Sequence, residues 1–147
     1  MPSPAAHGTR PEVVSRLRLA VLRVARRMRQ QANAGVTASQ LSVLATVERH
    51  GPVGLKELAA IERVQPPSIT RIVAALEDAG LVVRAVSPHD RRAALVSLTT
   101  DGKHALNKVR RQRDAWLAQR LAAMDTADVE AITRALPALE RLIEDRP

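Results

Sequence analysis

Apolar side chains recur at alternating spacings of three and four residues in two segments, one near each end of the chain. In the first segment they are Val14, Leu17, Val21, Val24 and Met28, and in the last they are Val129, Ile132, Leu136, Leu139 and Ile143. This spacing lines one narrow stripe of an α-helix, which is the geometry of a seam between packed helices. The pattern therefore predicts long helices over residues 12–34 and from 125 to 146. Two matched seams favour a homodimer in which they meet across a two-fold axis.

Between these segments the pattern predicts three short helices, a hairpin and another long helix. The short helices cover residues 37–50, 55–61 and 65–79, the hairpin strands 81–86 and 94–99, and the next helix 102 to about 124. Proline is well tolerated in a first helical turn, so Pro66 and Pro67 mark a helix start. Gly80 suits the C-terminal end of the same helix. β-Branched residues are frequent in both hairpin strands.

This order of elements predicts a mainly α fold with a small β-hairpin wing, in which a winged helix-turn-helix occupies residues 37–100. Dimerisation helices at 12–34 and 102–146 complete a single domain that spans 12–147. Residues 1–11 contain three prolines and a glycine, and they predict a disordered N-terminal arm.

The charge of the chain points to a polyanionic partner. Lys and Arg number 23 against 15 Asp and Glu, which gives a formal net charge of +8. A balance of this kind favours binding to nucleic acid or to an anionic membrane surface. Six arginines and no acid lie between Glu12 and Glu48. Three roles are open for these arginines. They can form a solvated face opposite the first seam, line a ligand cavity, or contact DNA.

Several classes of protein are excluded by what the sequence lacks. With no cysteine, it has no disulfide, thiolate metal site or thiol redox sensor. The four histidines match no metal-ligand spacing, and no nucleophile–base pair or glycine-rich phosphate loop is present. We therefore expect no metal, no cofactor and no enzymatic activity. No apolar run reaches the length of a membrane span and no secretory signal is present, so we expect a soluble cytoplasmic protein without a membrane partner.

A winged helix-turn-helix presents the N-terminal residues of its recognition helix to base edges in the major groove of double-stranded DNA. In the helix at 65–79, the polar residues that can read or contact DNA are Gln65, Ser68, Thr70 and Arg71. The tip of the hairpin carries His89, Arg91 and Arg92. Arginine at such a tip can enter a minor groove. The alternative for the wing arginines is a solvated turn.

Phosphate groups offer a second kind of DNA contact, which orients a protein without reading sequence. The candidates for these contacts are Thr37, Ser39, Lys56 and Arg63. Thr37 and Ser39 also suit plain helix capping, because a side-chain oxygen at a helix N-terminus accepts from a free backbone N–H. Ser68 has the same alternative.

The segment Asp90–Thr99, DRRAALVSLT, followed by Thr100-Asp-Gly102, resembles the wing signature of the MarR family (multiple antibiotic resistance regulators). Further matches are Gly54–Ala59, Ser68–Val73 and Leu76–Val82, so the resemblance covers roughly residues 13–145. It implies a triangular homodimer whose first, fifth and sixth helices interlock. The helix at 65–79 would lie in the major groove, and Arg92, often with Arg91, would reach the minor groove. Asp90 would hold that arginine or a recognition-helix arginine in place.

Many members of this family are repressors that phenolic or other aromatic anions release from DNA. Arg113 lies on the apolar stripe of the helix at 102–124, where a charge should be paired or should face a cavity. It can bind an anionic effector, with Trp116 stacking nearby; an interhelical salt bridge is the alternative.

We therefore expect a sequence-specific, homodimeric transcriptional regulator, a repressor acting on a pseudo-palindromic operator and released by a small aromatic or anionic effector. One alternative is an architectural winged-helix protein that binds DNA by charge, with low specificity and without an effector. Another is an interaction module that has lost DNA binding, which the basic wing disfavours. A preference of about 10³ or more for one site over random DNA separates the regulator from the architectural protein.

Overall fold

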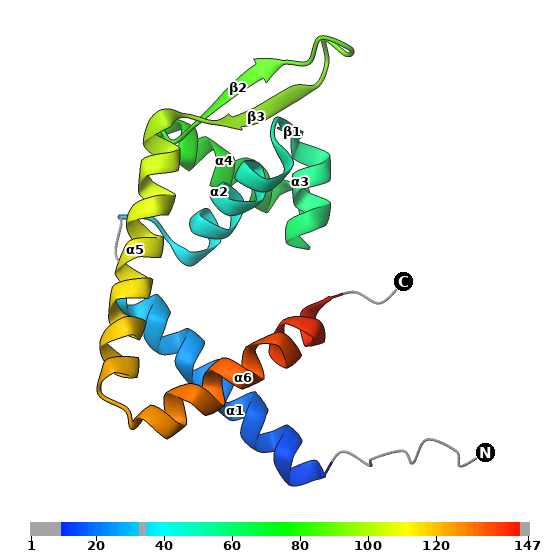
Figure 1. The fold of residues 1–147 in the computed structure, drawn as a ribbon. Coiled ribbons are helices and arrows are strands. Elements are labelled where there is room, and N and C mark those ends of the chain that lie inside the picture. Colours follow the sequence, from blue (N-terminus) through cyan, green and yellow to red (C-terminus); the bar gives the residue numbers. More distant parts are fainter. Residues whose placement is uncertain (1–9, 33–34, 145–147) are drawn as a thin grey trace, which may run out of the picture. The chain divides into compact units, whose positions relative to one another are not determined.

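The computed structural model describes residues 10–32 and 35–144. Its elements are α1 (Pro11–Gln31), α2 (Ala38–His50), β1 (Val53–Gly54), α3 (Leu55–Glu62), α4 (Pro66–Asp78), β2 (Val82–Val86), β3 (Ala94–Leu98), α5 (Thr100–Ala122) and α6 (Thr126–Ile143) (Figure 1). The mainly helical fold with a small antiparallel sheet is confirmed. The predicted arm lies almost wholly outside the described residues. The chain divides into two compact units, residues 1–113 and 114–147, and the boundary falls within α5.

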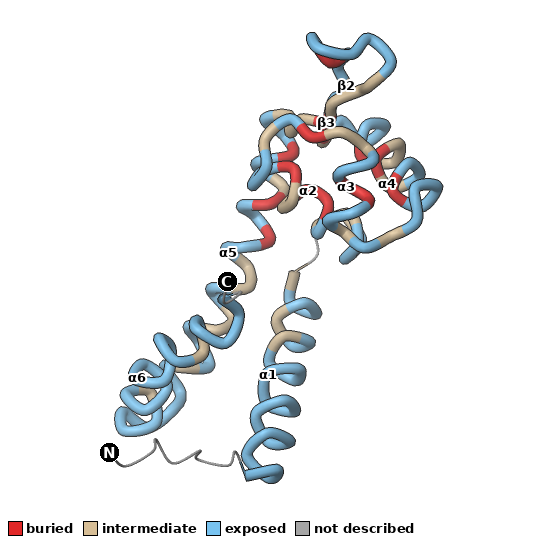
Figure 2. The backbone as a smooth tube through the Cα atoms, turned by 90° about the vertical axis from the view of Figure 1, so that its right-hand side faces the viewer, coloured by how far each residue is buried: buried red, intermediate tan, exposed pale blue. Residues whose placement is uncertain are grey.

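The hydrophobic core of the first unit joins α2, α3, α4, the sheet and the first half of α5. Its buried members are Val43, Leu44, Val47, Val53, Leu58, Ala59, Ile69, Val73, Leu76, Val82, Val96 and Leu106. Figure 2 shows the buried residues concentrated in this part of the chain. All of these side chains are aliphatic, so the core consists of small contacts between helices and the sheet. This core fixes the positions of α3, α4 and the hairpin formed by β2 and β3 relative to one another.

The sheet has a third strand that the sequence did not predict. The strand order is β1-β3-β2, and both pairs are antiparallel. Val53 of β1 pairs with Val96 of β3, while β2 and β3 pair from Val82↔Leu98 to Val86↔Ala94. A strand of only two residues shows no alternation of polar and apolar positions, so its sequence gives no strand signal. It nevertheless ties the start of α3 to the hairpin.

A hydrogen-bonded junction connects the end of α4 with the start of α5. Gly80 has φ +73°, the left-handed conformation expected after a helix end. The Thr99 hydroxyl donates to the Gly80 carbonyl at 2.7 Å and accepts from the Gly102 N–H at 3.0 Å. The Thr99 N–H also donates to the Leu81 carbonyl at 3.1 Å. Thr99 therefore caps α5 and fixes it to the segment between α4 and β2.

The two terminal helices contribute no residue to the buried core. No residue of α1 or α6 is buried, although both helices are described along their whole length. Most residues of the predicted seams are exposed: Leu17 and Val21 are 38% and 52% exposed in α1, and Leu136 is 45% exposed in α6. Met28, Val129 and Leu139 are half-buried. Figure 2 shows exposed and half-buried residues along both helices. The helix limits agree with the predicted ones within a few residues, and α6 continues through Pro137.

Candidate nucleic-acid interface

The turn between α3 and α4 has the geometry of a helix-turn-helix. Arg63 follows the last residue of α3 in the left-handed conformation, with φ 54°. The Val64 N–H donates to the Ala59 carbonyl at 3.1 Å, and the Arg63 N–H donates to the Ala60 carbonyl at 3.2 Å. These bonds satisfy carbonyls at the helix end and turn the chain into α4. The Arg63 side chain, a predicted phosphate contact, is exposed.

Helix α4, which was predicted to be the recognition helix, separates its buried and polar faces as predicted. Ile69, Val73 and Leu76 are fully buried against the core. On the other side, Gln65 at the N-cap position, Ser68 and Arg71 are exposed. The fourth candidate, Thr70, is also exposed, but its hydroxyl donates to the Pro66 carbonyl at 2.9 Å. The hydroxyl proton of Thr70 is therefore donated within the helix, and only its oxygen can accept a hydrogen bond from DNA.

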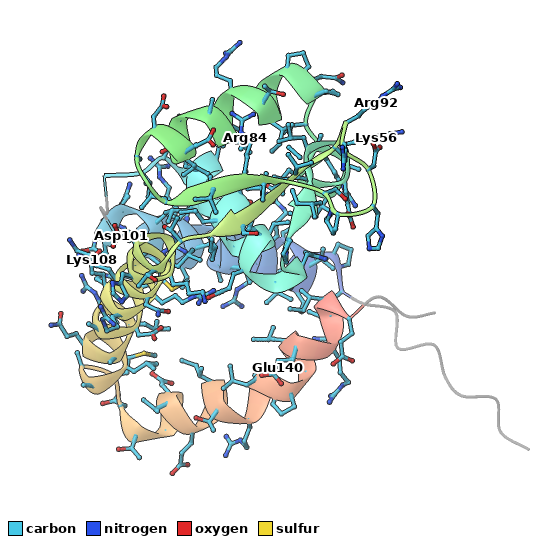
Figure 3. The ribbon with its side chains drawn as sticks, turned by 90° about the horizontal axis from the view of Figure 1, so that it is seen from above. Lys56, Arg84, Arg92, Asp101, Lys108 and Glu140 are labelled. Atoms are coloured by element: carbon cyan, nitrogen blue, oxygen red, sulfur yellow. The ribbon has the colours of Figure 1, made fainter. Side chains whose placement is uncertain are left out.

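The wing loop at 87–93 is closed by backbone hydrogen bonds. The Ser87 N–H donates to the Ala93 carbonyl at 2.9 Å, and the Ala93 N–H donates to the Asp90 carbonyl at 3.0 Å. His89, Arg91 and Arg92 are exposed. Figure 3 shows that Arg92 points away from the helices. The wing therefore presents its cationic side chains to solvent beyond the helical core.

Asp90 orients the wing by a different contact from the one implied by the family resemblance. Its carboxylate Oδ1 accepts from the backbone N–H of Arg92 at 2.9 Å. Within the described residues it forms no ion pair with an arginine side chain. Asp90 thus fixes the backbone of the turn, and the Arg92 guanidinium is left to solvent.

Arg84 is a positioning residue that the sequence did not reveal. Its Nε donates to Glu77 Oε2 at 2.9 Å, which joins β2 to α4. The pair connects the wing to the recognition helix, and Figure 3 labels Arg84 in the hairpin. The one signal for it in the sequence is a charged residue within an apolar strand, which does not identify the partner.

The remaining phosphate candidates lie at helix starts. Thr37 caps α2: its hydroxyl accepts from the Gln40 N–H at 3.2 Å, and Gln40 Oε1 accepts from the Thr37 N–H at 2.8 Å. This reciprocal pair is a capping box, in which Gln40 takes a part that the sequence did not indicate. Ser39 and Lys56 are exposed in the first turns of α2 and α3.

A cavity of about 300 Å³ lies between α2 and α5, with the end of α1 at its edge. Leu41, Ala45, Leu106 and Val109 form its apolar part, and Arg29, Arg110 and Arg113 supply positive charge. The Nε of Arg113 is buried without a hydrogen-bond partner in the described residues. No ion pair involves Arg113 among those residues, so the salt-bridge alternative is not formed within this part of the chain.

A second arginine of this cavity is paired. Arg110 Nη1 and Nη2 donate to the two carboxylate oxygens of Glu48 at 3.2 and 2.5 Å, which joins α5 to α2. The hydrogen bond from Arg110 lowers the pKa of Glu48, and the same bond raises the pKa of Arg110. Trp116 does not line the cavity; its ring lies 5.6 Å from the guanidinium carbon of Arg120.

Within residues 10–32 and 35–144, no helix combines the length and the hydropathy that crossing a membrane requires. In the same ranges, no cluster of three or more His, Asp or Glu side chains is arranged to hold a metal ion.

The chain is similar to known transcriptional regulators over nearly its whole length. A family model described as the MarR family matches residues 36–94. An HTH-type transcriptional regulator of Mycobacterium bovis is 38% identical over 136 residues, which cover 92% of this chain and 95% of that protein. The HTH-type transcriptional repressor MdtR of Bacillus subtilis is 35% identical over 88 residues, 60% of this chain and 57% of that protein. A crystal structure of a transcriptional regulator of Pseudomonas aeruginosa, 31% identical, has a TM-score of 0.81 and covers 92% of this chain and 96% of that chain.

Proposed function

The chain belongs to the MarR family of DNA-binding transcriptional regulators, which are not enzymes, and from this premise we propose that it is a homodimeric repressor of a pseudo-palindromic operator. The observation that carries the proposal is the exposed polar face of α4 beside a cationic wing. The name of the related repressor MdtR supports repression over activation. A dimer that covers its operator excludes other proteins from that DNA.

In the proposed complex, α4 enters the major groove and the wing lies along the neighbouring minor groove. A helix of about 10–12 Å diameter fits a major groove about 12 Å wide. Ser68 and Arg71 then face base edges, with Gln65 and Thr70 beside them. Arg91 and Arg92 reach the minor groove, where a narrow width concentrates negative potential. Thr37, Ser39, Lys56 and Arg63 would contact phosphates, and His89 would contact DNA beside the wing arginines.

The terminal helices support the proposed dimer. Both α1 and α6 carry an apolar seam, and neither helix has a buried residue in the single chain. Apolar stripes of this length are covered in a stable protein. A second copy covers them across a two-fold axis, which presents two copies of α4 to half-sites about one helical turn, roughly 34 Å, apart.

Arg92→Ala should weaken operator binding by about 1–3 kcal/mol and lower the salt slope of binding by about one unit. The reason is the loss of an exposed guanidinium from the wing tip. The measurement is a series of DNA-binding titrations at several salt concentrations, with a genome-derived operator and a random duplex of equal length.

Arg134→Ala is the matched control, because it removes the same charge from the exposed surface of α6. It should leave operator affinity within about twofold. Equal effects of the two substitutions would show that only net charge matters. A preference for operator over random DNA below tenfold would favour the architectural alternative.

We further propose that the cavity between α2 and α5 binds a small aromatic or other organic anion that releases the protein from its operator. The buried Nε of Arg113, which has no partner within the described residues, supports this role. A carboxylate beside it would satisfy that donor, and the apolar wall formed by Leu41, Leu106 and Val109 suits a ring.

Arg113→Ala should abolish release of the operator by benzoate while operator affinity without benzoate stays within about threefold. The cause is the loss of the cation that the anion pairs with. Operator titrations with and without benzoate measure the effect. Arg111→Ala, an exposed arginine of the same helix that does not line the cavity, should respond like the wild type. If benzoate still releases the Arg113→Ala variant fully from the operator, the effector role of Arg113 is contradicted.

A further inference from the structure

The last residue of α3 is held by two hydroxyl groups from α2. Ser42 Oγ donates to Glu62 Oε2 at 2.7 Å, and Thr46 Oγ1 donates to Glu62 Oε1 at 2.5 Å. Ser42 and Thr46 are four residues apart and so lie one helical turn apart on the same face of α2. Hydrogen bonds to a charged acceptor are stronger than those between neutral groups. The two bonds therefore fix the end of α3 to α2.

Glu62 lies immediately before the turn that starts the recognition helix. Arg63, the next residue, has the left-handed conformation with φ 54°, and α4 begins at Pro66. A non-glycine residue in this conformation is held there by its surroundings. A shift at Glu62 is therefore carried through a short, constrained turn to the N-terminal residues of α4, which are the residues proposed to contact bases.

The two hydroxyl donors differ in one respect. Ser42 also lines the cavity between α2 and α5, whereas Thr46 does not. A serine hydroxyl has a single proton and donates it to one acceptor at a time. An anion bound in the cavity supplies a second acceptor for that proton. The Ser42–Glu62 hydrogen bond and the anion then compete, while the Thr46–Glu62 bond is unaffected.

We propose that Glu62 is a positioning residue for the recognition helix, and that Ser42 is the group through which an anion in the cavity loosens it. The second half of this inference rests on the effector function proposed above. The anion draws the Ser42 proton away from Glu62, so that one of the two bonds that hold the end of α3 is lost. The first residues of α4 then lose their fixed position, and specific binding weakens more than binding to random DNA.

The first test needs no effector. Glu62→Gln keeps the size of the side chain, but it leaves one neutral carbonyl oxygen to accept and replaces the other oxygen with an NH2 donor, so both hydroxyl groups can no longer donate to it. This variant should lower the operator-to-random affinity ratio about fivefold to tenfold. The salt slope should stay unchanged, because no phosphate contact is lost. Glu57→Gln, which neutralises an exposed acid of the same helix, is the control and should keep the ratio. An unchanged ratio in Glu62→Gln would overturn the positioning role.

The second test compares Ser42→Ala with Thr46→Val at saturating benzoate. Calorimetry measures benzoate binding to each free protein, and DNA titration measures the fall in operator affinity. The wild type and Thr46→Val should lose operator affinity about tenfold, within the usual range of allosteric coupling. Ser42→Ala should still bind benzoate yet lose less than twofold.

Three outcomes are decisive. If benzoate binds and releases the wild type, and Ser42→Ala responds equally, the Ser42 coupling is wrong and the effector function stands. If Ser42→Ala and Thr46→Val both lose the response, Ser42 has no special part and the coupling is again wrong. If benzoate neither binds nor releases the wild type, the proposed effector function and the coupling fail together, and Glu62→Gln alone decides the positioning role.

Discussion

Gly102→Ala should lower the free energy of unfolding by about 3–5 kcal/mol. A Cβ atom at this position would lie 2.1 Å from the carbonyl oxygen of Leu81 and 3.2 Å from a methyl carbon of Leu98. The first of these contacts is with backbone, so no side-chain rotation relieves it. The first turn of α5 must move away, and the Gly102 N–H loses its fixed place against the Thr99 hydroxyl.

The cost is large because the same helix carries core residues further along. Leu106 and Val109 are 4% and 2% exposed, and a displaced α5 withdraws both from the core. Chemical denaturation followed by circular dichroism measures the change. Gly54→Ala is the control: its φ is −72° and a Cβ there meets no atom within 4 Å, so the loss should be below about 1 kcal/mol. Equal losses in both variants would contradict a steric role for Gly102.

Helix limits were predictable because local chemistry fixes them. Pro66 begins α4, Gly80 follows its end with a positive φ, and Thr37 caps α2, each for a reason confined to a few neighbouring residues. The same local patterns predicted the helices and strands from which most of the buried core residues come.

Contacts between segments that are distant in the chain could not be predicted from the sequence. Whether Gly102 is needed for backbone freedom or for space depends on Leu81, which lies in the segment between α4 and β2. Arg84 pairs with Glu77 and Arg110 pairs with Glu48, and the sequence does not indicate which of several acids is the partner of each arginine. For Arg113 the sequence offered a cavity or a salt bridge, and only the fold shows a cavity beside a buried Nε without a partner in the described residues. The exposure of the DNA-contact candidates agrees with their proposed role, but the bases that they read depend on a partner outside the chain.

Leu139→Arg should convert the protein to a monomer and reduce operator affinity by roughly 10²–10⁴-fold, because a dimer binds its second half-site at a high effective concentration. Leu139 belongs to the α6 seam, whose neighbour Leu136 is 45% exposed in the single chain. A guanidinium buried in that interface without a partner costs more than the apolar contacts around it supply. Light scattering should report a fall from twice the chain mass of 16.0 kDa to 16.0 kDa.

Ala138→Arg separates the interface from the added charge. At about 100° per residue, position 138 lies well away from the seam on α6, and its side chain is exposed. This variant should remain dimeric and bind the operator as tightly as the wild type. If Leu139→Arg aggregates, Leu17→Arg repeats the test on the α1 seam, where the side chain is 38% exposed. Dimers of wild-type affinity in both seam variants would refute the proposed interface, and the two copies of α4 would then have to be joined through another surface.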